Sequence, residues 1–301
     1  MSIILNTSIS SFSELKAKYP SRVVALEDGV VPKVFSSIPI GIVNLMPTKE
    51  ATEKQWSSLM VASDHWIEPI WIQMDSYTPK NTDASYLEQA YVGCEEADLG
   101  KLQGIIITGA PVELLPFEKV LYWKELSTFL DKVMAAHIPI LSVCWGAQAL
   151  LYKRFGIDKY ELEEKCFGVF EHQIETQHNL LSNLESQIHL PHSRHTGWRE
   201  EDLEREKALK ILIRSKQAGI FALEDTEGNV YWSGHPEYEQ ETLLLEYHRD
   251  IAKELDIQAP KGYVSSKQGQ WSTPHQWHDT ARKLLTNWID EIGPALRHMK
   301  K

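Results

Sequence analysis

A cysteine between a predicted strand and a predicted helix is the strongest candidate for chemistry in this chain. The apolar run 138–143 predicts a buried strand, and the helix-forming residues 148–153 follow almost at once. Cys144 therefore lies on a tight turn, which Gly146 lets pack closely. Free N–H groups at the helix start, the amide of Trp145 among them, favour a thiolate and stabilise an oxyanion. This pattern indicates a nucleophile elbow with cysteine in place of serine, although a lone cysteine at a strand end is more often a core residue.

A second motif supplies the groups that such a nucleophile needs. The β-rich run 229–232 precedes Gly234, and His235 and Glu237 then lie two residues apart in an extended segment. Residues i and i+2 of an extended segment point the same way, so the Glu237 carboxylate can orient the imidazole and stabilise its charged form. Cysteine, histidine and glutamate in this order indicate a nucleophile, a base and an orienting group.

The elements that carry these motifs alternate between apolar strands and helices. Continuous apolar strands separated by helices predict an α/β fold with a mostly parallel, doubly wound sheet. Ligands bind beyond the carboxyl ends of such strands, where Cys144, His235 and the segment Thr108-Gly109-Ala110-Pro111 should meet. The predicted strands are 38–45, 66–74, 103–107, 138–143, 167–172, 187–190, 209–215, 219–223 and 229–232, and the predicted helices are 10–18, 48–60, 117–134, 148–153, 239–255 and 279–292.

The chain divides into three parts by sequence pattern. Residues 1–36 lack clear periodicity and are predicted to form an N-terminal arm. Residues 37–256 contain the alternating elements and both motifs, so they should form the catalytic domain. Residues 257–301 should form a C-terminal extension whose helix packs on the same domain.

Composition is that of an ordinary globular protein. The chain has 301 residues, 43% hydrophobic and 24% charged, which is enough to bury a large core. A net charge of −11 argues against a nucleic-acid partner and against an anionic membrane. The three cysteines include no CxxC pair, so neither a disulfide framework nor a metal site is expected. Neither a signal sequence nor an apolar run of about twenty residues is visible, and a cytoplasmic location is expected.

The cysteine elbow and the distal His-Pro-Glu together resemble the class I glutamine amidotransferase fold, which is flavodoxin-like. In finer detail the chain resembles the homoserine O-acyltransferase family, a CoA-dependent branch of that fold. The matching segments span residues 38 to about 250 in the expected order, and as a set they are highly specific. They are Asn44-Leu45-Met46-Pro47-Thr48-Lys49, Thr108-Gly109-Ala110-Pro111, Val143-Cys144-Trp145, Glu164-Lys165, Gly168-Val169-Phe170-Glu171-His172, Pro191-His192-Ser193-Arg194, Gly234-His235-Pro236-Glu237-Tyr238 and Arg249-Asp250.

The resemblance implies an enzyme with a covalent thioester intermediate and no bound cofactor. It implies that Cys144 takes the acyl group from acyl-CoA, a cosubstrate, that His235 is the proton acceptor and that Glu237 orients it. The acceptor would be the hydroxyl of L-homoserine, in methionine biosynthesis. Backbone N–H groups of Trp145 and of the loop 44–49 would stabilise the oxyanion.

Three further matching residues imply how the amino acid is bound. Lys165, Ser193 and Arg249 match the substrate-binding positions of the family. An arginine can hold an α-carboxylate with two hydrogen bonds. Arg249 could equally form an ion pair with Glu246 or Asp250 on a helix surface.

Glu113 is expected to select the acyl group. It follows the segment 108–111, where the resemblance implies that family members have either glycine or glutamate. A carboxylate here would repel the distal carboxylate of a succinyl group and would leave an acetyl group unaffected. Acetyl-CoA is therefore the expected donor, with succinyl-CoA as the alternative.

Two segments depart from the family pattern and leave the acceptor open. The arm 1–36 is unlike the usual opening, and residues 277–283 stand where the family commonly has Arg-Ser-His-Gly-Asn. L-Serine, and with it cysteine biosynthesis, is therefore an alternative to L-homoserine. A glutamine amidotransferase would use the same three catalytic residues, and a non-catalytic protein could keep the fold. A homodimer is compatible with the sequence.

Overall fold

A large mixed sheet runs through the computed structural model, which describes residues 3–26, 37–77, 81–266 and 271–293. The strand order is β2-β1-β4-β3-β6-β7-β12-β11-β10-β8-β9, with β5 paired to β4. Pairing is parallel from β2 to β12 and antiparallel from β12 to β9. The strands are β1 Ile3–Leu5, β2 Val23–Ala25, β3 Ser37–Val43, β4 Trp66–Gln73, β5 Val92–Gly93, β6 Gly104–Ile107, β7 Ile140–Val143, β8 Lys159–Ile174, β9 Gln187–Trp198, β10 Leu209–Ser215, β11 Gly219–Asp225 and β12 Val230–Trp232.

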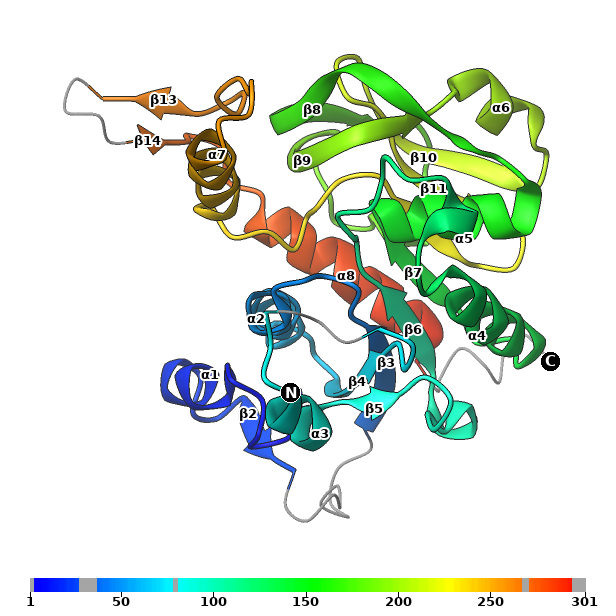
Figure 1. The fold of residues 1–301 in the computed structure, drawn as a ribbon, viewed down its shortest axis with the longest axis vertical. Helices are drawn as coiled ribbons and strands as arrows, with labels where there is room; N and C mark the ends of the chain where they lie inside the picture. The colour runs from blue at the N-terminus through cyan, green and yellow to red at the C-terminus, as the bar shows by residue number, and fades with distance from the viewer. Residues whose placement is uncertain (1–2, 27–36, 78–80, 267–270, 294–301) are drawn as a thin grey trace.

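Helices cover both faces of the parallel half of this sheet (Figure 1). A separate hairpin, β13 Val264–Ser265 with β14 Trp271–Ser272, lies beyond α7. The described chain contains no helix that is long and apolar enough to cross a membrane. The helices are α1 Phe12–Lys18, α2 Lys49–Met60, α3 Ala84–Ala90, α4 Trp123–Ala135, α5 Trp145–Phe155, α6 Glu200–Arg205, α7 Thr242–Ala252 and α8 His278–Ile292, with short 3-10 turns η1 Leu99–Lys101, η2 Phe117–Lys119 and η3 Asn179–Leu181.

Each face of the sheet has its own hydrophobic core. Ile106 of β6 packs into the core that contains residues of α1, α2 and α8. Its neighbours Ile105 and Ile107 pack into the core on the opposite face, with residues of α4 and α5. Successive residues of a strand point to opposite faces, which is why β6 is apolar at every position. The two cores hold the strand ends rigidly, and the candidate site lies at those ends.

The N-terminal and C-terminal segments both pack on the central sheet. β1 pairs with β2 and β4 in parallel, so the predicted arm extends the sheet at one edge. Trp288 and Ile292 of α8 pack so closely on Gly104 that a Cβ there would lie 2.8 and 2.6 Å from their side chains. The domain boundaries at 36/37 and 256/257 stay a prediction.

Most predicted elements are present, and the main corrections concern their ends. The helix predicted at 117–134 is wrong at its start, because Val120 is extended and α4 begins only at Trp123. The strands predicted at 167–172 and 187–190 are much longer, as the antiparallel pair β8 and β9. The short elements β1, β2, α3, α6, β5, β13 and β14 were not expected.

Candidate active site

Cys144 lies at the junction of β7 and α5, on the predicted elbow. Its backbone has φ 51° and ψ −117°, a conformation that side chains rarely adopt and that local packing must enforce. Its N–H donates to the carbonyl of Trp232 on β12 at 2.7 Å. A Cβ on Gly146 would lie 2.6 Å from the carbonyl oxygen of Thr108, so only glycine lets the helix start this close to β6. The side chain of Cys144 is thereby aimed beyond the sheet edge.

His235 and Glu237 form a buried pair. Nδ1 of His235 lies 2.7 Å from Oε1 of Glu237, and both side chains are 4% exposed. This bond fixes Nδ1 as the protonated nitrogen and leaves Nε2 for the thiol. Burial disfavours a charged imidazole, but the negative charges of Cys144 and Glu237 outweigh it and raise the pKa of His235 well above its usual value. The site therefore favours the protonated form of the imidazole.

Three strand ends meet at this pair, as the sequence predicted. A Cβ on Gly109, after β6, would lie 3.0 Å from Cε1 of His235 and 3.4 Å from Cβ of Cys144. β7 lies between β6 and β12 in parallel register, so their carboxyl ends share one edge of the sheet.

A cavity of about 580 Å³ opens above these residues. Cys144 and His235 line it together with all three predicted substrate-binding residues and Glu113. Four of the eight large hydrophobic side chains that are exposed in the described chain also line it: Leu114, Leu115, Leu245 and Leu255. The cavity therefore combines a reactive pair with an apolar rim and a charged wall, which consists of Lys165, Glu246, Arg249 and Asp250.

The charged wall contains Glu246, which the sequence suggested only as an ion-pair partner of Arg249. Glu246 Oε2 accepts a hydrogen bond from Ser193 Oγ at 2.5 Å, and Oε1 accepts one from Tyr238 at 2.8 Å. Lys165 Nζ lies 3.4 Å from Asp250 Oδ2 and 3.8 Å from Glu246 Oε2. Glu246 and Arg249 lie one helical turn apart, and this spacing could have indicated from the sequence that both face the same site.

Arg249 is paired with its sequence neighbour. Its guanidinium lies 2.7 Å from Asp250 Oδ1, and its side chain is 54% exposed. The alternative of an ion pair with Asp250 is therefore observed, while Arg249 also lines the cavity. Arg249 is thus both an ion-pair partner of Asp250 and a lining residue of the cavity.

Lys165 reaches this wall from within a bulge of β8. Glu161 pairs with Thr196 and Cys166 pairs with Arg194, so the residues between 161 and 166 outnumber those opposite them on β9. The bulge releases Lys165 from regular pairing and directs it into the cavity.

Glu113 is half-buried and hydrogen-bonded, not a free surface carboxylate. Its Oε2 accepts from the N–H groups of His195 and Thr196, at 2.9 and 3.2 Å, and from the Thr196 hydroxyl at 3.1 Å. These bonds tie the loop after β6 to β9 and hold the negative charge beside the cavity.

The loop 44–49 is fixed by internal bonds. The N–H of Leu45 donates to Thr108 Oγ1 at 2.8 Å, and that of Met46 donates to Asn44 Oδ1 at 3.1 Å. These two amides are therefore occupied, as is that of Asn44, which donates to the carbonyl of Ile72 at 3.0 Å. Since Pro47 has no N–H, an oxyanion donor from this loop would have to be the amide of Thr48 or Lys49.

A buried lysine stabilises this loop. Lys49 Nζ donates to the carbonyl of Asn44. Burial lowers the pKa of Lys49 to about 8, although the nearby Glu53 opposes this shift. Tyr91 and Tyr86 in turn donate hydrogen bonds to Glu53, at 2.6 and 2.5 Å.

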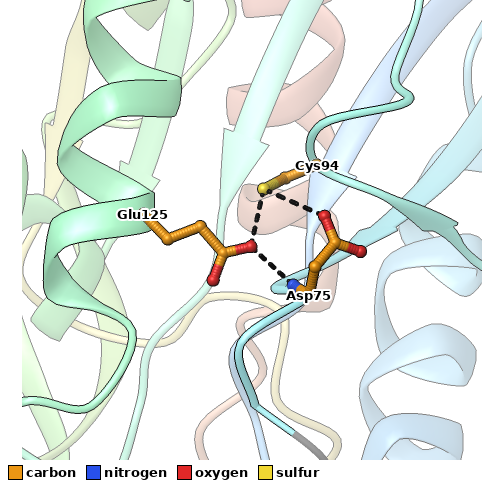
Figure 2. Close-up of side chains that lie close together, drawn as sticks. All are labelled: Asp75, Cys94 and Glu125. Atoms are coloured by element: carbon orange, nitrogen blue, oxygen red, sulfur yellow. Dashed lines mark hydrogen bonds between the residues drawn. The ribbon is translucent and has the colours of Figure 1, made fainter.

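One group of metal-ligand types occurs in the described residues, outside the cavity. Asp75, Cys94 and Glu125 lie with their ligand atoms within 4.8 Å of one another (Figure 2). Burial and the Glu125 carboxylate raise the pKa of Cys94, so its thiol stays protonated and donates to Glu125 at 3.0 Å. Glu125 also accepts from the N–H of Asp75 at 2.6 Å. These bonds make the group a junction between β4, β5 and α4.

Solved structures share this arrangement of strands and helices. A glutamine amidotransferase from Methylobacillus flagellatus has a TM-score of 0.56 at 11% identity, over 85% of this chain and 95% of that chain. One from Thermotoga maritima has a TM-score of 0.56 at 12% identity, over 85% and 97%. The protein therefore has the class I glutamine amidotransferase-like fold, as predicted.

Sequence relatives define the family. The model of the family described as homoserine O-succinyltransferase matches residues 22–293. A homoserine O-acetyltransferase from Geobacillus kaustophilus is 40% identical over 251 residues, which is 83% of each chain. Another from Petrotoga mobilis is 39% identical over 269 residues, 89% of this chain and 87% of its own. The chain belongs to the homoserine O-succinyltransferase family and is an acyltransferase, as its motifs predicted.

Proposed function

We propose that this protein transfers the acetyl group of acetyl-CoA to the hydroxyl of L-homoserine through a thioester on Cys144. One observation carries the proposal: Cys144 and His235, the latter bonded to Glu237, line the same cavity as charged groups suited to an amino acid. The names of the relatives from Geobacillus kaustophilus and Petrotoga mobilis support the donor and the acceptor.

The first half-reaction uses a thiolate–imidazolium pair of Cys144 and His235. The Cys144 thiolate attacks the carbonyl carbon of acetyl-CoA, and backbone N–H groups at the start of α5 stabilise the oxyanion. The bond from that carbon to the CoA sulfur then breaks. CoA leaves as a thiol with the proton of His235, so the products are acetyl-Cys144 and a neutral imidazole.

The same chemistry prepares His235 for the second half-reaction. The Cys144 thiolate raises the pKa of His235, and this negative charge disappears in the thioester. Neutral His235 then accepts the proton of the homoserine hydroxyl as its oxygen attacks the acetyl carbon. The bond to Cys144 sulfur breaks, and the thiolate–imidazolium pair is restored with O-acetylhomoserine as product.

The charged wall would bind the zwitterionic acceptor. An α-carboxylate would pair with the cations of Arg249 and Lys165, and the α-ammonium group would pair with Glu246. Ser193 holds the Glu246 carboxylate in place. A zwitterion would thus use both the positive and the negative side chains of this wall.

The opposite side of the cavity would receive the donor. Cys144 is only 5% exposed, so the long pantetheine arm of CoA must leave through the mouth. Leu114 and Leu115 on the loop after β6, 58% and 45% exposed, provide apolar surface for that arm. Glu113, on the same loop, would repel a succinyl group.

A product assay tests the proposal directly. Purified protein receives acetyl-CoA with homoserine, with serine, or with no acceptor, and mass spectrometry detects the product. O-Acetylhomoserine should form much faster than O-acetylserine. Faster formation of O-acetylserine would overturn the acceptor, and release of ammonia from glutamine without acetyl transfer would overturn the reaction class.

A further inference from the structure

Tyr238 connects His235 to the charged wall. Its side chain is 3% exposed and lies in the cavity next to His235. We propose that Tyr238 is a positioning residue that serves both half-reactions, through its ring for His235 and through its hydroxyl for Glu246. The proposal rests on the acetyl transfer described above.

The ring of Tyr238 stacks on the imidazole. The two ring centroids are 4.3 Å apart, and the ring planes differ by 16°. The bond from Nδ1 of His235 to Glu237 fixes one direction of the imidazole but permits rotation about that bond. A flat surface against the ring removes this rotation, so stacking and hydrogen bond together aim Nε2 at Cys144.

The hydroxyl of Tyr238 acts in the other direction. It donates to Glu246 Oε1 at 2.8 Å, and Ser193 donates to Oε2 of the same carboxylate. Glu246 is therefore held at both oxygens. A carboxylate fixed in this way loses little conformational freedom when it binds an ammonium group.

The backbone of Tyr238 is anchored by the C-terminal segment. Nε1 of Trp277 donates to the carbonyl oxygen of Tyr238 at 2.8 Å, and the Trp277 side chain is fully buried. Trp277 directly precedes α8. The C-terminal segment thus contributes one hydrogen bond to the placement of His235.

Two substitutions separate the two functions of Tyr238. Tyr238→Phe keeps the ring and removes the hydroxyl, so the burst of CoA released without acceptor should keep its rate, while the KM for homoserine rises about tenfold. Tyr238→Leu removes the stack, so the rate of the burst should fall more than tenfold. Tyr152→Phe is the matched control, because Tyr152 also bonds a glutamate, Glu118, but on an exposed surface outside the cavity. It should change neither quantity.

A third variant covers the case in which Tyr238→Leu fails to fold. Trp277→Phe keeps an aromatic ring and removes the N–H, so the burst rate should fall several-fold in a protein with an unchanged circular dichroism spectrum. An unchanged burst in folded Tyr238→Leu, or in Trp277→Phe if the former does not fold, would overturn the role of the ring. An unchanged KM for homoserine in Tyr238→Phe would overturn the role of the hydroxyl.

The pH dependence of the burst distinguishes a specific effect on His235 from a general loss of rigidity. A general loss of rigidity would lower the burst rate without changing its pH profile. Loss of the stack in Tyr238→Leu, or its displacement in Trp277→Phe, should alter the pH profile of the burst relative to wild type, and an identical profile would contradict a role at His235. Failure of the proposed function looks different. In that case the wild-type protein itself releases no CoA and carries no acetyl group on Cys144.

Discussion

Glu113 accepts two hydrogen bonds from Thr196, one from its N–H group and one from its hydroxyl. The carboxylate is therefore fixed beside the cavity that contains Cys144. A fixed charge discriminates against another charge better than a mobile one, because it cannot swing away from the ligand.

Glu113→Gly should open the donor site to succinyl-CoA. We expect kcat/KM for succinyl-CoA to rise about ten- to a hundredfold, or ~1.4–2.7 kcal/mol of relieved repulsion. Acetyl-CoA use should change little. Glu113→Gln, which keeps the volume and removes the charge, should also accept succinyl-CoA. If this variant rejects succinyl-CoA as strongly as wild type does, steric exclusion is the cause.

Cys144→Ser should abolish transfer while the protein still folds, because the replacement is of similar size at the same strained backbone position. In wild type given acetyl-CoA alone, peptide mass spectrometry should find the acetyl group on Cys144. Cys166→Ser, at a half-buried cysteine outside the cavity, is the control and should keep activity. Acetylation of Cys94 or Cys166 instead would contradict the mechanism.

Arg249→Lys should weaken homoserine use and leave the first half-reaction unchanged. Lysine keeps the positive charge but loses the two-pronged hydrogen bonding, so kcat/KM for homoserine should fall at least tenfold. The burst of CoA without acceptor reports the first half-reaction. Loss of that burst as well would show that Arg249 acts by stabilising α7.

Leu115→Ser should impair only donors that have a long arm. Less apolar surface at the rim should raise the KM for acetyl-CoA several-fold, while an acetyl thioester of N-acetylcysteamine, which lacks most of the arm, reacts as before. Leu121→Ser is the control, since Leu121 is 82% exposed and does not line the cavity. Equal effects on both donors would show that the pantetheine arm takes another path.

Acid should destabilise the protein through a buried histidine pair. His172 Nε2 lies 3.0 Å from His192 Nε2, and burial lowers the pKa of His172 from 6.5 to about 4. The unfolded chain therefore binds more protons between these values, and stability falls as the pH falls from about 6.5 to 4, by on the order of 3 kcal/mol. Denaturant unfolding of His172→Asn should show a weaker pH dependence than wild type. His137→Asn, at an exposed histidine, should match wild type instead.

Local patterns in the sequence were enough to predict the residues of the candidate catalytic set. Cys144 lies at a strand-to-helix turn, and His235 and Glu237 lie two residues apart in an extended segment, so periodicity alone places each. Glu246 and Tyr238 were not assigned functions, because their importance depends on contacts between α7, β9 and the end of β12. Helix ends were less predictable for the same reason: packing around η2 and Val120, not helix propensity, decides where α4 begins.

The bulge in β8 has a consequence for how this site can change during evolution. The ladder between β8 and β9 resumes at Cys166 and Arg194, directly after the bulge. An insertion or deletion within residues 162–165 would change the reach of the Lys165 cation without shifting the paired strands. Under the proposed function, acceptor preference could therefore diverge through the length of one segment while Cys144, His235 and Glu237 keep their geometry.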